Sequence, residues 1–205
     1  MKSTYFRRMI AALSLLCILP ALLVGLTSCG YKESTEPTDY VCLDVQGYGK
    51  IVIELRPETA PETVENFKKL VSDGFYDGLV FHRVIADFMI QCGGFDQNDV
   101  QKEADTINGE FLSNGFVNTL KHEPGVVSMA RSNHPNSASS QFFICTNVAD
   151  WLDGDYAAFG VVVDGMDVVY AIERVNTGVH YDDIGYPHSD WPRESVVIRR
   201  AYFVK

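Results

Sequence analysis

The segment FHRVIADFMIQ, residues 81–91, places one arginine among side chains that look suited to burial. Arg83 carries a permanent charge and several N–H donors, and Gln91 ends the run just before Cys-Gly-Gly. A guanidinium fixed beside apolar surface can stabilise an atom that becomes a stronger hydrogen-bond acceptor during a reaction. An arginine paired with a carboxylate is the structural alternative. The residue types alone leave both readings open.

Other site motifs are absent from the sequence. Gly47-x-Gly49 lacks the third glycine of a dinucleotide loop, and no G-x-S-x-G nucleophile elbow occurs. The acidic stretch with Asp96, Asp99 and Asp105 lacks the central glycine of a calcium loop. The histidines show no HExxH or paired spacing; they are His82, His122, His134, His180 and His188. We therefore expect no metal and no cofactor.

The elements that must position Arg83 are mostly short strands bounded by Gly, Pro, Asn and Asp. The sequence predicts strands at 41–45, 51–55, 79–85, 88–91, 126–130, 141–145, 159–163 and 196–203. Helices are predicted from Pro61 to a stop at Gly74, and around Val168, Val169, Ile172 and Val175. Many short strands with two helices favour one mainly-β domain, either a closed barrel or a sandwich.

The charge balance excludes one class of partner. The 205-residue chain is 46% hydrophobic and has a formal charge of −10. The first 30 residues carry only basic charges, and the remainder has 14 basic against 27 acidic groups, or −13. Because so acidic a domain repels phosphates, we expect no nucleic-acid binding.

The first 28 residues have the layout of an export signal, with a basic start and an apolar run from Met9 to Leu26. The run is followed by Leu26-Thr27-Ser28-Cys29, which resembles the bacterial lipobox. We expect a signal peptide at 1–28, a lipid-carrying Cys29 with a flexible tether over 29–39, and the folded domain at 40–205. Plain secretion and an uncleaved membrane anchor are the alternatives. A lipoprotein would lie in the cell envelope, on the outer side of the cytoplasmic membrane or in the periplasm if there are two membranes.

Three cysteines remain in the domain, Cys42, Cys92 and Cys145. Their odd number and the lack of CxxC spacing argue against a disulfide framework or a zinc site. We expect small buried thiols, with a single disulfide left open.

Three motifs in order, FHRVIADFMIQ, MARSNHPNSASSQFFI and WLDGDYAAFG, resemble the cyclophilin family of peptidyl-prolyl isomerases. The similarity runs from about Tyr40 to the C-terminus. It implies a closed eight-stranded antiparallel β-barrel capped by two α-helices. The interior of so small a barrel is filled by side chains, so the ligand is expected to bind on the outside.

The resemblance implies rotation about X-Pro bonds, which interconvert over a barrier of ~18–20 kcal/mol. A twisted amide frees the lone pair of the prolyl nitrogen, and Arg83 is the expected catalytic donor to it. The matched substrate-binding residues are Phe88, Met89, Phe143 and Leu152 for the proline ring, and Gln91, Ala130 and Arg131 for the peptide backbone. Gln141, Trp151 and Tyr156 complete the expected substrate-binding set, and Gln141 is also expected to support Arg83. His82 either supports the site from behind or is only a packed histidine.

The chain departs from the family pattern at a few positions. Tyr156 stands where many members have histidine and Cys92 where many have glycine. Arg131 replaces an asparagine of some relatives, which matters little if only its backbone binds substrate. Trp151 is present, so the resemblance implies a contact for cyclosporin A, although a tryptophan of the groove wall without that role explains it as well.

The leading hypothesis is a lipid-anchored, monomeric isomerase that acts on proline-containing polypeptides and assists the folding of exported proteins. A chaperone or adaptor that binds such peptides with little turnover is the alternative from another class. A purely structural envelope lipoprotein is the third.

Overall fold

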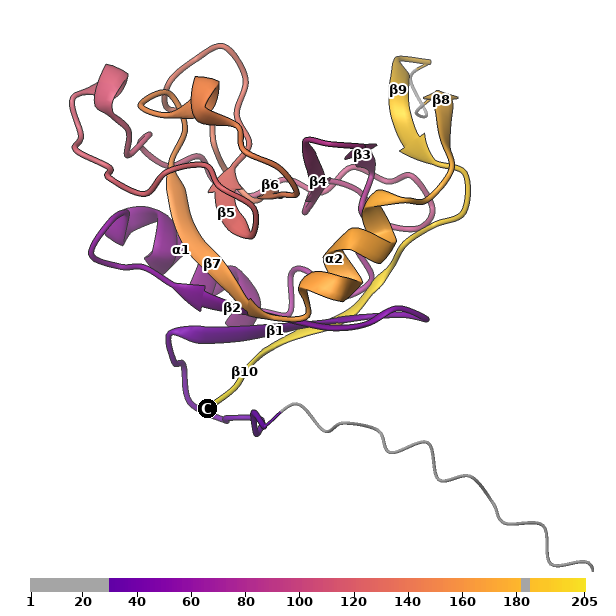
Figure 1. Ribbon diagram of the computed structural model, residues 1–205, viewed down its shortest axis with the longest axis horizontal. Helices are drawn as coiled ribbons and strands as arrows, with labels where there is room; N and C mark the ends of the chain where they lie inside the picture. The colour runs from indigo at the N-terminus through magenta and orange to yellow at the C-terminus, as the bar shows by residue number, and fades with distance from the viewer. Residues whose placement is uncertain (1–29, 182–184) are drawn as a thin grey trace, which may run out of the picture.

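The computed structural model describes residues 30–181 and 185–205, and strands dominate them (Figure 1). The first strands are β1 (Tyr40–Val45), β2 (Gly49–Leu55), β3 (Arg83–Ile85), β4 (Met89–Cys92) and β5 (Val126–Met129). The later ones are β6 (Phe142–Cys145), β7 (Ala158–Asp164), β8 (Thr177–Tyr181), β9 (Pro187–Pro192) and β10 (Ile198–Phe203). The α-helices are α1 (Pro61–Ser72) and α2 (Met166–Glu173), and short 3-10 helices cover Leu112–Asn114 and Asp150–Leu152.

Eight strands form one curled antiparallel sheet in the order β10-β1-β2-β7-β5-β6-β4-β3. The segments leading into its two end strands bond to each other. Phe81 N donates to Val196 O at 2.9 Å, and Ile198 N donates to Leu79 O at 2.8 Å. The predicted mainly-β fold with eight antiparallel strands and two helices is confirmed.

The inside of the curled sheet is filled by aromatic and branched side chains. Phe67 is fully buried and meets Phe142 edge-on at 5.2 Å between ring centroids and Phe159 at 5.1 Å. Leu43, Ile53 and other strand residues complete the same cluster. Since the interior has no room for a ligand, binding sites must lie on the outer face.

Helix α1 forms where Pro61 is pre-set for the first turn and apolar residues recur at helical spacing. Its buried side chains are Thr63, Val64, Phe67, Leu70 and Val71. A distant residue caps its N-terminus, because the carboxylate of Glu110 accepts the backbone N–H groups of Glu62 at 3.0 Å and Thr63 at 2.8 Å. This cap ties the helix to the long segment between β4 and β5.

The hairpin of β8 and β9 was not predicted from the sequence. Its register pairs Thr177 with Pro192 and Tyr181 with Pro187. Trp191 is 6% exposed and packs with Val80, Phe95 and Val197, outside the main core. The hairpin thus stands beside β3 at one end of the molecule (Figure 1).

The expected flexible tether is packed on the domain over most of its described length. Lys32 N donates to Lys205 O and Ser34 N donates to Phe203 O, both at 2.9 Å. Glu33 forms an antiparallel bridge with Val204. These bonds involve the backbone, so the polar composition that predicted a tether gave no sign of them. The predicted signal peptide at 1–28 and the lipid-carrying Cys29 lie outside the described residues.

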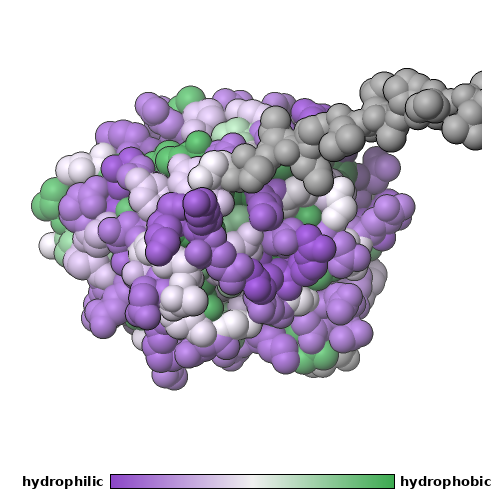
Figure 2. Space-filling view, turned by 90° about the horizontal axis from the view of Figure 1, so that it is seen from below, coloured by the Kyte–Doolittle hydropathy of each residue, from purple (hydrophilic) through white to green (hydrophobic). Residues whose placement is uncertain are grey.

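Hydrophilic side chains predominate on the face seen in Figure 2, with apolar ones scattered among them. In the described part of the chain, no helix is long and apolar enough to cross a bilayer. Cys42, Cys92 and Cys145 are buried and form no disulfide with one another, which confirms the prediction of buried thiols.

Candidate active site

The alternation of side chains along three neighbouring strands builds the site. In β4 and β6, Ile90, Phe142 and Ile144 belong to the main core, whereas Met89 and Phe143 belong to a separate cluster. The register places Arg83 of β3 opposite Gln91 of β4, and Gln91 opposite Phe143 of β6. Directly opposed residues have Cβ atoms about 5 Å apart. A cation, an amide and an aromatic ring thus form a row across the outer face.

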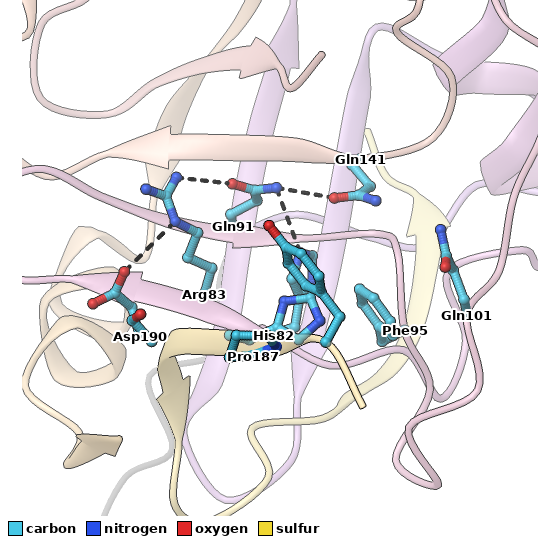
Figure 3. A pocket seen from close by; sticks show the side chains of 11 residues that line it. His82, Arg83, Gln91, Phe95, Gln101, Gln141, Pro187 and Asp190 are labelled. Carbon is cyan, nitrogen blue, oxygen red and sulfur yellow. Dashed lines mark hydrogen bonds and ion pairs between the residues drawn. The ribbon is translucent and has the colours of Figure 1, made fainter. Parts of the chain in front are cut away.

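Arg83 is only loosely held by its neighbours (Figure 3). Its Nη1 lies 3.5 Å from Gln91 Oε1, and its Nε lies 3.8 Å from Asp190 Oδ2 of β9. Both distances exceed that of a good charged hydrogen bond, and the side chains of Arg83 and Asp190 are 45% and 38% exposed. The ion pair that the sequence left open therefore exists, but it leaves the guanidinium able to donate elsewhere.

Gln91 is fixed from the side away from Arg83. Its Nε2 donates to Gln141 Oε1 at 2.9 Å and lies 3.4 Å from His82 Nε2. With its amide nitrogen turned toward these two residues, its carbonyl oxygen faces Arg83 (Figure 3). Gln141 therefore supports Arg83 indirectly, through Gln91.

His82 both packs and supports the site. The residue is 4% exposed, and its ring lies 5.0 Å from Phe95 and 5.8 Å from Trp191. Burial lowers the pKa of His82 to about 4. At neutral pH the imidazole is therefore uncharged, and its Nε2, 3.4 Å from Gln91 Nε2, is an acceptor for Gln91 in the tautomer that carries the proton on Nδ1.

A cavity of about 220 Å³ opens beside Arg83, and we call it the apolar cup. Its apolar walls are Phe88, Met89, Phe143, Leu152 and Tyr156, and Arg83, Gln91, Ala130 and Arg131 form the rest of its lining. Nine of the residues that the sequence suggested for substrate or catalysis thus line one cavity. Tyr156 meets Phe143 edge-on at 6.1 Å, so it extends the apolar wall.

Arg131 lines the cup, but its charge is engaged elsewhere. Its Nε donates to the Asp155 carbonyl at 2.9 Å, and its guanidinium carbon lies 4.6 Å above the ring of Tyr156. The neighbouring Ala130 N donates to Gln141 O at 2.9 Å, which continues the β5–β6 pairing beyond Met129. Arg83 is therefore the more available cation at the cup.

Trp151 and Cys92 lie next to the cup without lining it. Trp151 is 61% exposed, and its ring centroid is 5.5 Å from that of Phe88. Cys92 is buried in β4, and the turn after it is made by Gly93 at φ +90°, where a Cβ atom would lie 2.5 Å from Ser140 O. The glycine that this turn requires is retained, so Cys92 does not distort the strand.

A buried network behind the cup was not predicted from the sequence. His122 Nδ1 lies 2.9 Å from Asp153 Oδ1, and His122 Nε2 lies 3.0 Å from Ser128 Oγ. The imidazole is 1% exposed and stacks on Phe143 at 6.1 Å between centroids. Ser128 is fully buried, so this Ser-His-Asp arrangement holds the wall of the cup and offers no accessible nucleophile. Its residues are too far apart in sequence for spacing to reveal it.

Comparison with known proteins places this geometry in context. Residues 40–203 match the family model for cyclophilin type peptidyl-prolyl cis-trans isomerases. Peptidyl-prolyl cis-trans isomerase cyp18 of Streptomyces antibioticus is 44% identical, with 75% of this chain and 92% of that protein covered. Peptidyl-prolyl cis-trans isomerase B of Escherichia coli is 42% identical over 74% of this chain and 92% of that protein.

Among solved structures, a similar one is a Cryptosporidium parvum cyclophilin type peptidyl-prolyl cis-trans isomerase in the presence of the dipeptide Ala-Pro. Its TM-score is 0.63 and its sequence identity 26%, with 80% of this chain and 98% of that chain covered.

Proposed function

The chain belongs to the cyclophilin family of peptidyl-prolyl cis-trans isomerases, and we propose that Arg83 is its catalytic residue, acting on X-Pro bonds held in the apolar cup. The activity rotates a bond and breaks none. The uncatalysed rotation takes roughly 10–100 s because the amide loses its resonance midway. A catalyst must therefore bind the twisted amide more tightly than either planar form.

The loose contacts of Arg83 support its role. When the amide twists, the prolyl nitrogen regains a lone pair that a guanidinium N–H can reach. Since the contacts of Arg83 to Gln91 and Asp190 are 3.5 and 3.8 Å long, a new hydrogen bond displaces little. The donor is in place before the reaction, which is the condition for electrostatic stabilisation of a transition state.

The size and lining of the apolar cup support its role as the proline site. A volume of about 220 Å³ walled by Phe88, Met89 and Phe143 suits one pyrrolidine ring and its neighbouring backbone. Gln91 lines the cup beside Arg83, and its hydrogen bond to Gln141 orients its amide, as a residue that binds the peptide backbone requires. The related structure solved with Ala-Pro also supports a proline ligand.

The test is an isomerisation assay on a proline tetrapeptide with the purified protein. We expect a rate well above that of the buffer alone. Binding of the peptide without acceleration would overturn catalysis by this chain and would favour the chaperone or adaptor alternative.

We further propose that the chain is a lipid-anchored protein of the cell envelope that assists the folding of exported polypeptides. The apolar run ending in Leu26-Thr27-Ser28-Cys29 supports this. Lys32 is bonded to the domain only three residues after Cys29, and three residues span at most about 11 Å. A lipid on Cys29 would therefore hold the domain close to the bilayer. Cys29→Ser should release the protein from membranes or leave a heavier precursor, and unchanged fractionation and mass would refute the anchor.

Two partner properties complete the proposal. Trp151 is exposed beside the apolar cup, which supports a contact for cyclosporin A. The hydrophilic face seen in Figure 2 supports a monomer. Inhibition by cyclosporin A that is lost in Trp151→Ala, and sedimentation as a monomer, are the expected results; no inhibition or a stable dimer would contradict them.

A further inference from the structure

A second and larger cavity adjoins the apolar cup on the side of the β8–β9 hairpin. It has a volume of about 600 Å³, and we call it the hairpin cavity (Figure 3). Arg83 and Gln91 line both cavities. The two therefore meet at the residues proposed to act on the X-Pro bond.

The wall of the hairpin cavity is anchored by a buried side chain. Trp191 of β9 stacks on His180 of β8 at 4.4 Å and meets Phe95 edge-on at 5.2 Å. At the base of the hairpin, Arg193 N donates to Asn176 O at 2.8 Å. Because Trp191 is 6% exposed, this side of the cavity is formed before any ligand arrives.

The lining of the cavity is rich in flat rings. His82 and Phe95 are buried at its floor, and Tyr186 and His188 come from the hairpin side. The ring centroids of His188 and Phe95 are 5.5 Å apart at an angle of 74°. Such rings prefer edge-to-face or offset contacts with a further ring. Gln101 and Ser189 add polar groups at the edge.

We propose that the hairpin cavity is a specificity subsite that takes an aromatic side chain of the substrate, near the proline in sequence. This inference rests on the proposed function, because it needs the proline to be seated in the apolar cup. One residue of an extended peptide advances about 3.3–3.6 Å. A side chain one or two residues from the proline can therefore enter a cavity that begins at Arg83 and Gln91.

The charges at the cavity favour a ring over a basic side chain. Asp190 is the acidic group of its lining, and its carboxylate already lies 3.8 Å from Arg83 Nε. A lysine of the substrate would compete with Arg83 for Asp190 and meet like charge beside it. An aromatic ring meets no such competition.

The experiment measures isomerisation by NMR exchange, without a coupling protease, on Ala-Ala-Pro-Ala-Ala and on variants with one alanine replaced by phenylalanine or lysine. At one of the positions one or two residues from the proline, phenylalanine should raise kcat/KM about 2- to 10-fold, mainly by lowering KM. This is the size of effect that one or two ring contacts give. The readout is the kcat/KM of the phenylalanine peptide divided by the kcat/KM of the alanine peptide. We expect His188→Ala to bring this ratio close to one.

Tyr181→Ala is the matched control, since it removes an exposed aromatic side chain from the same hairpin but outside the cavity lining. It should keep the ratio of the unchanged protein. As a second measurement, nuclear Overhauser contacts should join the peptide ring to His188 or Tyr186 in the unchanged protein. A preference for lysine, no preference at any position, or a ratio that survives His188→Ala without such contacts would overturn the subsite. Turnover of no peptide at all would instead overturn the proposed function.

Discussion

Acid should destabilise the protein through His82, because the folded chain holds this imidazole in its neutral form. Burial lowers its pKa from 6.5 to about 4, and the residue is 4% exposed. The unfolded chain has no such burial, so it binds the proton first as the pH falls. The stability associated with neutral His82 is therefore complete above pH 6.5 and is lost as the pH falls toward 4. Between pH 7.5 and pH 5 these two pKa values give a loss of about 2 kcal/mol.

Urea unfolding at pH 7.5 and pH 5 measures this loss. His82→Gln keeps a polar group near Gln91 and does not titrate in this range, so its loss of unfolding free energy should be smaller by about 2 kcal/mol. His134→Gln is the control, because His134 is exposed, and it should show the full loss. His122 is unchanged in all three proteins, so its contribution cancels. An equal loss in His82→Gln and the unchanged protein would refute the reasoning.

Three further changes test other parts of the account. Phe143→Ala removes a 4% exposed ring, so denaturation should show a loss of about 3–5 kcal/mol and the KM for proline peptides should rise; an unchanged KM would contradict the apolar cup. Gly93→Ala should lower Tm clearly more than Gly47→Ala, because only at Gly93 does the added Cβ lie 2.5 Å from backbone; equal shifts would argue against the close approach. Glu110→Gln should cost about 1 kcal/mol of unfolding free energy by weakening the cap of α1, whereas the exposed Glu65→Gln should change it little; equal effects would exclude the cap.

The residues of the apolar cup were predicted from the motifs that resemble the family, and alternation along the strands explains why they lie together. Arg83, Met89, Gln91 and Phe143 lie on strands whose other residues, such as Ile90 and Ile144, fill the core. Because successive side chains of a strand point to opposite faces of the sheet, the four site residues lie on the outer face. Together with Phe88, Ala130, Arg131, Leu152 and Tyr156, which the same motifs supplied, they make up the nine residues that line the cavity.

The hairpin could not be predicted in the same way. β8 and β9 pair only with each other, and their sequences mix His, Asp, Pro and Tyr without alternation. The buried Trp191 packs them against the body of the domain. The contact between Asp190 and Arg83 depends on this packing of the hairpin. No local sequence pattern could therefore predict it. The segment at 32–34 was missed for a related reason, since backbone bonds to a strand need no apolar side chains.

The most direct test of the central claim compares catalysis with ground-state binding in Arg83→Ala. If Arg83 stabilises only the twisted amide, kcat/KM should fall about 10²- to 10³-fold, as when one donor to a transition state is removed, while the Kd for a proline peptide changes only a few-fold. NMR line shapes at increasing peptide concentration give both quantities from one sample. A Kd that weakens as much as kcat/KM falls, or a rate equal to that of the unchanged protein, would contradict the claim.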